Sequence, residues 1–366
     1  MTERSSEIRI AIAGVGNCAS ALVQGLAYYR DHAEIPEGVM QPRIGPYAPA
    51  DIRVVAAFDI DSRKVGRPLA EAIFAPPNCA LAFQTALDDP GPTVLMGPVL
   101  DGCAPHMADW PDEQAFRPAD AKPVDIAAAL RASGAEILVN YLPVGSEAAA
   151  RHYAEACLSA GVALVNCIPV FLASDPAWAE RFRAAGLPII GDDVKSQFGA
   201  TILHRTVAEL MRRRGCTLSR TYQLNTGGNT DFLNMLARDR LASKKKSKTN
   251  SVQSQLAAPL PDRDIHIGPS DYVAWQKDNK VAFIRVEGAG FGGVPLELEM
   301  RLSVQDSPNS AGVVTDAIRC LRLARDRGLG GPLLAPSAAL MKSPPVQMTD
   351  PAAQDALAAF LDQARS

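Results

Sequence analysis

Lysines are concentrated in one short polar stretch of the sequence, residues 243–248, which reads SKKKSK. Lys244 and Lys248 are four positions apart, so they would lie on one face if this stretch is helical. Like charges at that spacing repel by about 0.2–0.5 kcal/mol, and a bound phosphate would replace the repulsion with charge-assisted hydrogen bonds. The stretch is therefore a candidate anion site. A solvated basic loop or a nucleic-acid patch remains the alternative.

Acidic residues stand at three predicted turns. GDDVKSQFG (191–199) lies just beyond the carboxyl end of a predicted strand, where ligands bind in open α/β sheets, and it contains Asp192, Asp193, Lys195 and Ser196. NTGGNTDFLNM (225–235) places Asp231 at a predicted helix start, and QDSPNSAG (305–312) places Asp306 at a strand-to-helix turn. Each acid alone is better explained by helix capping. Together with the lysines, they indicate a polar catalytic centre.

A dinucleotide-binding motif follows the first predicted strand. GVGNCA (14–19) is the GxGxxA version of the Rossmann fingerprint, at the point where a helix begins. Gly14 permits the turn, Gly16 lets the backbone approach a pyrophosphate, and Ala19 is small enough for helix and strand to pack. Asn17 and Cys18 complete the predicted cofactor site. A glycine turn that serves packing alone is the alternative.

The acid expected to bind the cofactor's ribose comes late in this sequence. It normally follows the glycines by about 20 residues, at the end of the second strand. Here the second strand ends at Asp59 and Asp61, because PEGVMQPRIGPYAPAD (36–51) intervenes. We interpret that segment as an inserted surface loop and Asp59 as the ribose ligand. A carboxylate there would repel a 2′-phosphate, so NAD is favoured over NADP.

The elements that must position these residues alternate between strand and helix over the first 200 residues. Strands are predicted at 8–14, 53–61, 136–143, 162–169 and 187–193, and helices at 18–31, 146–161 and 175–186. Strands separated by helices of this length indicate βαβ units and a parallel sheet. The fold class is thus predicted to be α/β, with a Rossmann-type doubly wound parallel sheet.

After residue 200 the pattern changes. One helix is predicted at 200–214, and strands at 221–225, 280–288 and 295–304 then follow without helices between them. KDNK (277–280) is predicted to be a tight turn, which makes this sheet largely antiparallel. A helix returns at 312–328. We therefore predict an NAD-binding Rossmann domain at 1–200, completed by 311–366, and a second domain of α+β character at 201–310.

Composition argues against several other classes of protein. A net charge of -3, with 47% hydrophobic and 21% charged residues, gives no general attraction to nucleic acid or an anionic membrane. No apolar run approaches the ~20 residues of a membrane helix. Acidic residues stand where a signal peptide would be basic. Seven cysteines without a CxxC pair indicate neither a disulfide framework nor a zinc knuckle. We expect a reduced cytoplasmic protein without nucleic-acid or membrane partners.

A series of ordered motifs between about residues 8 and 345 resembles the inositol-3-phosphate synthase (myo-inositol-1-phosphate synthase) family in its compact actinobacterial form. They are GVGNCASALVQG, AFDID, NYLPVGSE, GDDVKSQFGAT, LNTGGNTDFLNM, SKKKSK, HIGPSD, DSPNSAGV and LMKSPP. The resemblance implies an NAD-dependent isomerase that cyclises glucose 6-phosphate to 1D-myo-inositol 3-phosphate, in inositol and phospholipid biosynthesis. C5 is oxidised, a C6 proton is removed, the enolate attacks the C1 aldehyde, and C5 is reduced again with a tightly bound, recycled NAD.

The resemblance also implies roles for individual residues. Essential lysines fall on Lys244, Lys248, Lys280 and Lys342, and acids on Asp193, Asp231 and Asp306. We assign Lys280 and Lys342 to the C5 oxygen and proton transfer, and Lys244 and Lys248 to the C1 oxygen and the phosphate. Asp231 joins this catalytic group, whereas Asp193, Ser196 and Asp306 are placed with the cofactor.

The resemblance further implies a homotetramer built through the second domain, which would be both catalytic and oligomeric. A divalent or monovalent cation could bind Asp192, Asp193 and Asp306, but no ligand spacing requires one. Two other functions stay open at this level. An ordinary two-domain NAD oxidoreductase would release NADH at every turnover. A non-catalytic sensor of NAD or sugar phosphate would use the lysines to bind an anionic partner.

Overall fold

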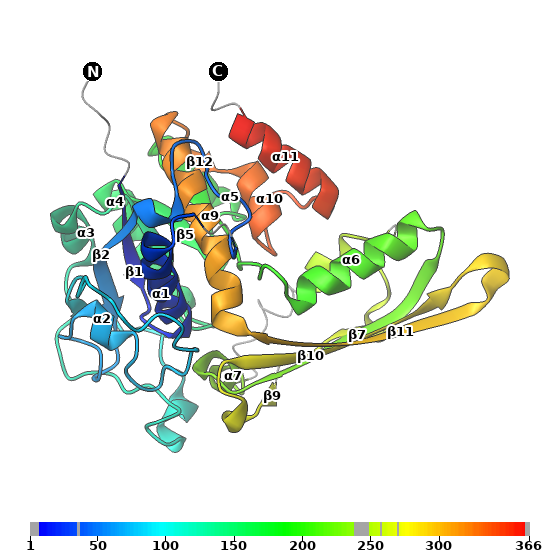
Figure 1. Cartoon of the computed structure of the whole chain (residues 1–366), viewed down its shortest axis with the longest axis horizontal. Helices are drawn as coiled ribbons and strands as arrows, with labels where there is room; N and C mark the ends of the chain where they lie inside the picture. Colours follow the sequence, from blue (N-terminus) through cyan, green and yellow to red (C-terminus); the bar gives the residue numbers. More distant parts are fainter. Residues whose placement is uncertain (1–6, 35–36, 238–248, 257, 269–270, 363–366) are drawn as a thin grey trace.

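The computed structural model describes residues 7–34, 37–237, 249–256, 258–268 and 271–362 (Figure 1). It contains a seven-stranded sheet in the order β12-β6-β5-β4-β1-β2-β3, in which every pair is parallel. The strands are β1 (Ile8–Ala13), β2 (Ile52–Asp59), β3 (Val94–Met96), β4 (Ile137–Asn140), β5 (Ala163–Asn166), β6 (Pro188–Ile190) and β12 (Gly331–Pro332). The predicted α/β class is confirmed.

Helices cover both faces of this sheet because the strands are apolar on both sides. Ile8, Ile10 and Ile12 of β1 pack in one core with α1 (Asn17–Asp31), α9 (Asp306–Asp326), α10 (Leu334–Leu340) and α11 (Asp350–Asp362). Ala11 and Ala13 belong to the opposite core, with α3 (Ile126–Ser133), α4 (Glu147–Ala160) and α5 (Pro176–Ala184). The short α2 (Leu69–Ala72) lies in a third cluster beside β3. The sheet is therefore doubly wound.

The second sheet is mixed. β10 (Asn279–Ala289) pairs antiparallel with β7 (Thr217–Gly227) and β11 (Pro295–Gln305), whereas β8 (Ile265–Ile267) and β9 (Asp271–Tyr272) pair parallel with β7. The three long strands extend away from the parallel sheet (Figure 1). Ala200 of α6 (Ala200–Arg213) packs against Ala282 and Ile284 of β10. The long strands thus pair antiparallel, as predicted, whereas the short parallel strands β8 and β9 were not predicted.

Several local details differ from the sequence expectations, and helices α3, α10 and α11 were not predicted. β3 and β12 were not predicted, and α9 begins at Asp306 rather than at residue 312. The insertion at 36–51 is only partly a surface loop, because Ile44 and Tyr47 are buried against the core. The domain boundaries at residues 200 and 310 stay predictions. No helix within the described ranges is long and apolar enough to cross a membrane.

Candidate active site

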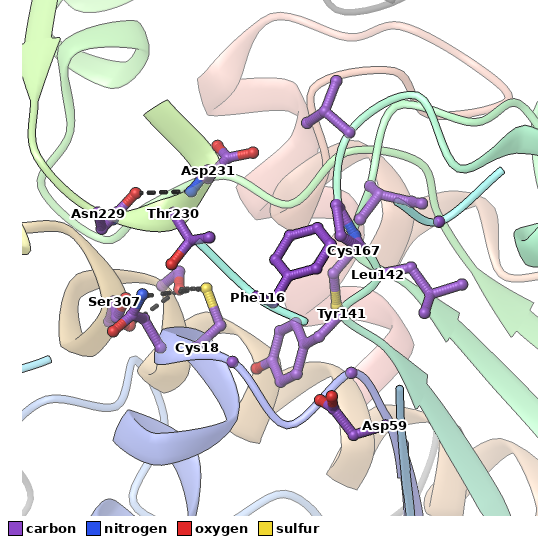
Figure 2. Close-up of a pocket in the computed structure, with 18 of the residues that line it drawn as sticks. Cys18, Asp59, Phe116, Tyr141, Leu142, Cys167, Asn229, Thr230, Asp231 and Ser307 are labelled. Atoms are coloured by element: carbon purple, nitrogen blue, oxygen red, sulfur yellow. Dashed lines mark hydrogen bonds between the residues drawn. The ribbon is translucent and has the colours of Figure 1, made fainter. Parts of the chain in front are cut away.

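A large pocket lies at the carboxyl ends of β1, β2, β4, β5 and β6, where these strands meet one end of the second sheet (Figure 2). The Rossmann topology brings these strand ends to one edge of the sheet. The short α7 (Thr230–Asn234) and the first turn of α9 close the opposite side. The lining therefore comes from segments spread over most of the sequence, among them residues 14, 16–18, 58–60, 64, 78, 141–144, 167–169, 193–194, 196, 229–232, 280, 306–307, 310 and 342.

The glycine turn has the geometry of a pyrophosphate cradle. Gly14 has φ +92°, and a Cβ there would lie 2.7 Å from the Tyr141 carbonyl oxygen, so a side chain is excluded. A Cβ on Gly16 would meet nothing within 4 Å, which leaves space for a ligand against the backbone. Among the residues that the structure describes, no side chain caps the N-terminus of α1. Its first N–H groups are thus free to bind an anion.

The neighbouring motif residues differ in what they do. The Asn17 side-chain oxygen accepts hydrogen bonds from the backbone of Cys79 (2.6 Å) and Ala80 (2.8 Å), so it fastens a nearby loop to the turn. Cys18 lines the pocket, and burial raises the pKa of its thiol to about 12, which makes it a poor nucleophile. Ala19 is fully buried beneath the turn, as a helix–strand packing position should be.

Asp59 lines the same pocket at the end of β2. One carboxylate oxygen accepts from the Val15 N–H (2.6 Å), and the other accepts from Ile60 and Asp61 N–H groups (both 2.7 Å). The side chain therefore stabilises the glycine turn. The oxygen that accepts only from Val15 has a further lone pair for a ligand hydroxyl.

Two lysine–carboxylate pairs enter the pocket from different parts of the chain. Lys342 Nζ lies 2.8 Å from the Asp193 carboxylate, and the Lys342 N–H also donates to the Asp193 carbonyl (2.7 Å). Lys280 Nζ lies 3.0 Å from the Asp306 carboxylate. The second pair follows from strand register, because Asn279 faces Gln305 in the β10–β11 pairing. Each lysine side chain is largely buried.

A buried acid, Asp278, ties three pocket segments together. Its carboxylate accepts from Asn229 Nδ2 (2.9 Å), Ser307 Oγ (2.8 Å) and the Ser307 N–H (3.1 Å), and its carbonyl accepts from the Asp306 N–H. Burial, followed by repulsion from Asp306, raises the pKa of Asp278 to about 6. The acid therefore fixes the first turn of α9 beside β10.

Asn229 also caps α7, since its side-chain oxygen accepts from the Asp231 N–H at 3.0 Å. Asp231 thereby lines the pocket on the side opposite Asp59 in the view of Figure 2. Two other lining residues carry buried polar atoms, Tyr141 Oη and Thr230 Oγ1. Neither atom has a hydrogen-bond partner among the described residues. Such atoms are candidates to bond a ligand.

The structure brings most of the predicted site residues together. Those that line the pocket are Gly14, Gly16, Asn17, Cys18, Asp59, Asp193, Ser196, Asp231, Lys280, Asp306 and Lys342. Lys244 and Lys248 lie outside the described residues. Asp192 is buried and accepts from Asn166 and Ser174, and Lys195 is buried against the Ala338 carbonyl.

Within the described ranges, no group of three or more histidine, cysteine, aspartate or glutamate side chains could hold a metal ion. A cation at Asp192, Asp193 and Asp306 thus gains no support. Five residues at or beside the pocket were not predicted from the sequence: Lys64, Asn78, Tyr141, Asp278 and Ser307. Tyr141 lies in the NYLPVGSE motif directly after a predicted strand, which is a signal that could have identified it.

A family model, full-length relatives and a solved structure point to the same family. A family model described as myo-inositol-1-phosphate synthase matches residues 199–307. An inositol-3-phosphate synthase of Mycolicibacterium smegmatis is 53% identical over 99% of this chain and 100% of its own length. The enzyme of that name from Mycobacterium tuberculosis is 52% identical over 98% and 97%. A myo-inositol-1-phosphate synthase-related protein of Thermotoga maritima superposes with a TM-score of 0.82 at 25% identity, over 97% and 98% of the two chains.

Proposed function

The chain belongs to the myo-inositol-1-phosphate synthase family, and we propose that it is an inositol-3-phosphate synthase, an NAD-dependent isomerase of glucose 6-phosphate. One observation carries this proposal for the site: two lysine–carboxylate pairs, Lys280–Asp306 and Lys342–Asp193, lie in the same pocket as the glycine turn. Charge stabilisation for an enolate and a cofactor site are thereby brought together, as a redox-neutral cyclisation requires.

The residues of the pocket fit a dinucleotide. The open backbone at Gly16 and the start of α1 would hold the pyrophosphate. The Asp59 oxygen that accepts only from Val15 would accept from a ribose hydroxyl with its second lone pair. The unpartnered hydroxyls of Tyr141 and Thr230 provide further polar contacts. When bound, NAD supplies the hydride acceptor and donor for C5 of the sugar.

The two lysines supply positive charge where oxygen atoms of the substrate become negative. Each ammonium is held by a carboxylate about 3 Å away, so its orientation is set before the substrate arrives. We assign both to the C5 oxygen and to proton transfer, with Asp231 among the catalytic acids. Lys244 and Lys248 are proposed for the C1 oxygen and the phosphate. Tetrameric assembly and a cytoplasmic location also remain part of this proposal.

Turnover with substoichiometric NAD tests the function. Glucose 6-phosphate should be consumed and an inositol phosphate identified by NMR, without steady accumulation of NADH absorbance. Lys280→Met and Lys342→Met should each lower kcat by about 100-fold or more, because each removes a preorganised cation. The exposed Lys122→Met is the matched control and should retain full activity. Stoichiometric NADH would instead indicate an ordinary oxidoreductase, and binding without turnover would indicate a sensor.

A further inference from the structure

Lys64 is a buried cation beside the glycine turn that the proposed chemistry does not use. It follows β2, is only 3% exposed and lines the pocket. Its ammonium donates to the Val15 carbonyl (2.8 Å) and to Asn78 Oδ1 (2.8 Å). Both acceptors are neutral, and one of the three ammonium N–H bonds has no acceptor among the described residues.

Within the described part of the chain, no ion pair neutralises the charge of Lys64. No carboxylate among the described residues lies within 4.0 Å of its ammonium, although Asp59 and Asp61 attract it from farther away. The carboxylate of Asp59 is engaged by backbone N–H groups instead. A buried ammonium without a counter-ion is costly, and burial accordingly lowers the pKa of Lys64. An anionic ligand in the pocket would offset that cost.

The same contacts hold the glycine turn from both sides. The Val15 N–H donates to Asp59, while the Val15 carbonyl accepts from Lys64 and from Asn78 Nδ2 (3.0 Å). Hydrogen bonds thus fix both the N–H and the carbonyl of Val15, the central residue of the turn. The N–H groups of Gly16, Asn17 and Cys18 follow directly, so their direction depends on this arrangement.

We propose that Lys64 is a cofactor-binding residue, which supplies the counter-charge for the dinucleotide's pyrophosphate and holds the glycine turn in its binding shape. The proposal rests on the cofactor part of the proposed function. Dinucleotide sites of this fold rely chiefly on backbone N–H groups and the helix dipole for the pyrophosphate. A buried side-chain cation would add a charge-dependent contribution, which separates this assignment from a purely structural role.

Equilibrium binding to the full chain tests the assignment. Lys64→Met should weaken NAD and ADP-ribose by about tenfold or more, the loss expected for a charge-assisted hydrogen bond of 1.5–3 kcal/mol. Adenosine, which lacks the pyrophosphate, should lose less than about twofold. NAD affinity of the wild type should fall with added salt more steeply than that of Lys64→Met. Lys64→Arg should keep the salt dependence, and the exposed Lys122→Met should match the wild type.

Lys64→Gln serves if Lys64→Met does not fold, because an amide retains donors for Val15 while losing the charge. If the substitution weakens adenosine and ADP-ribose equally, or leaves the affinity for NAD unchanged, the role of Lys64 is wrong while the cofactor proposal stands. A wild-type chain that binds neither NAD nor ADP-ribose would overturn the cofactor proposal, and the role of Lys64 with it.

Discussion

At the scale of single residues, the pocket depends on acids that serve the fold and the ligand together. Asp59 is the clearest case, because its carboxylate accepts three backbone hydrogen bonds and also lines the pocket. Its removal would therefore have two separable effects. Loss of the Val15 contact should weaken every dinucleotide, whereas loss of negative charge should favour a ligand carrying a 2′-phosphate.

We expect wild-type protein to bind NAD much more tightly than NADP. Asp59→Ala should weaken NAD and narrow the ratio of the two dissociation constants by about tenfold, because the repulsion of the 2′-phosphate is lost. Titration calorimetry with both cofactors gives the ratio directly. If the two cofactors already bind the wild type equally, Asp59 does not face the ribose.

Asp278 should make stability depend on pH. Its pKa is raised to about 6 in the folded protein, above the ordinary value near 3.9. Between about pH 4 and 6 the carboxyl of Asp278 is therefore protonated in the folded protein but ionised in the unfolded chain. The stabilisation that this proton gives to the folded protein is lost as pH rises through 6. At about 1.4 kcal/mol per pKa unit, the loss is about 2–3 kcal/mol.

The Asp278→Asn variant has no carboxyl to titrate at this position. Its free energy of unfolding, relative to that of the wild type, should therefore rise by about 2–3 kcal/mol as pH goes from 4.5 to 7. Urea unfolding at several pH values measures this difference. Any loss of stability that the substitution causes equally at every pH does not affect the trend. The exposed Asp109→Asn is the control and should show no such trend. Stability curves that stay parallel for Asp278→Asn and wild type would contradict the assigned pKa.

At the scale of elements, α9 joins the pocket to the insertion that separates α1 from β2. Its first turn carries Asp306 and Ser307, and its middle carries the fully buried Arg319. Arg319 donates to the carbonyls of Gln41 (2.8 Å) and Pro42 (3.2 Å) and pairs with Asp316. The insertion is therefore anchored to the core through its backbone, although many of its residues are exposed.

Arg319→Met should lower the free energy of unfolding by about 3–5 kcal/mol, because it leaves Asp316 buried without its partner. Urea denaturation measures the change. Arg213→Met, at an exposed position of α6, should cost less than about 0.5 kcal/mol. A loss for Arg319→Met as small as that of the control would show that the insertion is not held by this contact.

The same elements show what could be predicted from sequence. The glycine turn and the long strands have strong local patterns, and both were found. The start of α9 was missed because DSPNS has the composition of a turn. Pro308 nevertheless lies in the first helical turn, where a missing N–H costs nothing. β12 contains two residues and has no periodicity to detect. Lys64 and Asp278 gain meaning only from tertiary contacts.

At the scale of the whole molecule, the pocket combines residues from both ends of the sequence. Asp193 follows β6, but its partner Lys342 comes after α10, and the two are joined through backbone hydrogen bonds between residues 192–193 and 342–343. Likewise β12, next to β6 at the edge of the parallel sheet, is formed by residues 331–332. The first sheet and the pocket are thus completed by the same late segment.

This arrangement has a consequence for how the protein is made. A chain emerging from the ribosome presents the glycine turn, Asp59 and Asp193 long before Lys342 has been synthesised. Since domains generally fold as units, and since α9, α10 and α11 cover one face of β1, the cradle for the dinucleotide cannot be completed before this late segment has been synthesised. The cofactor site and the cations for the sugar would then form together, near the end of translation.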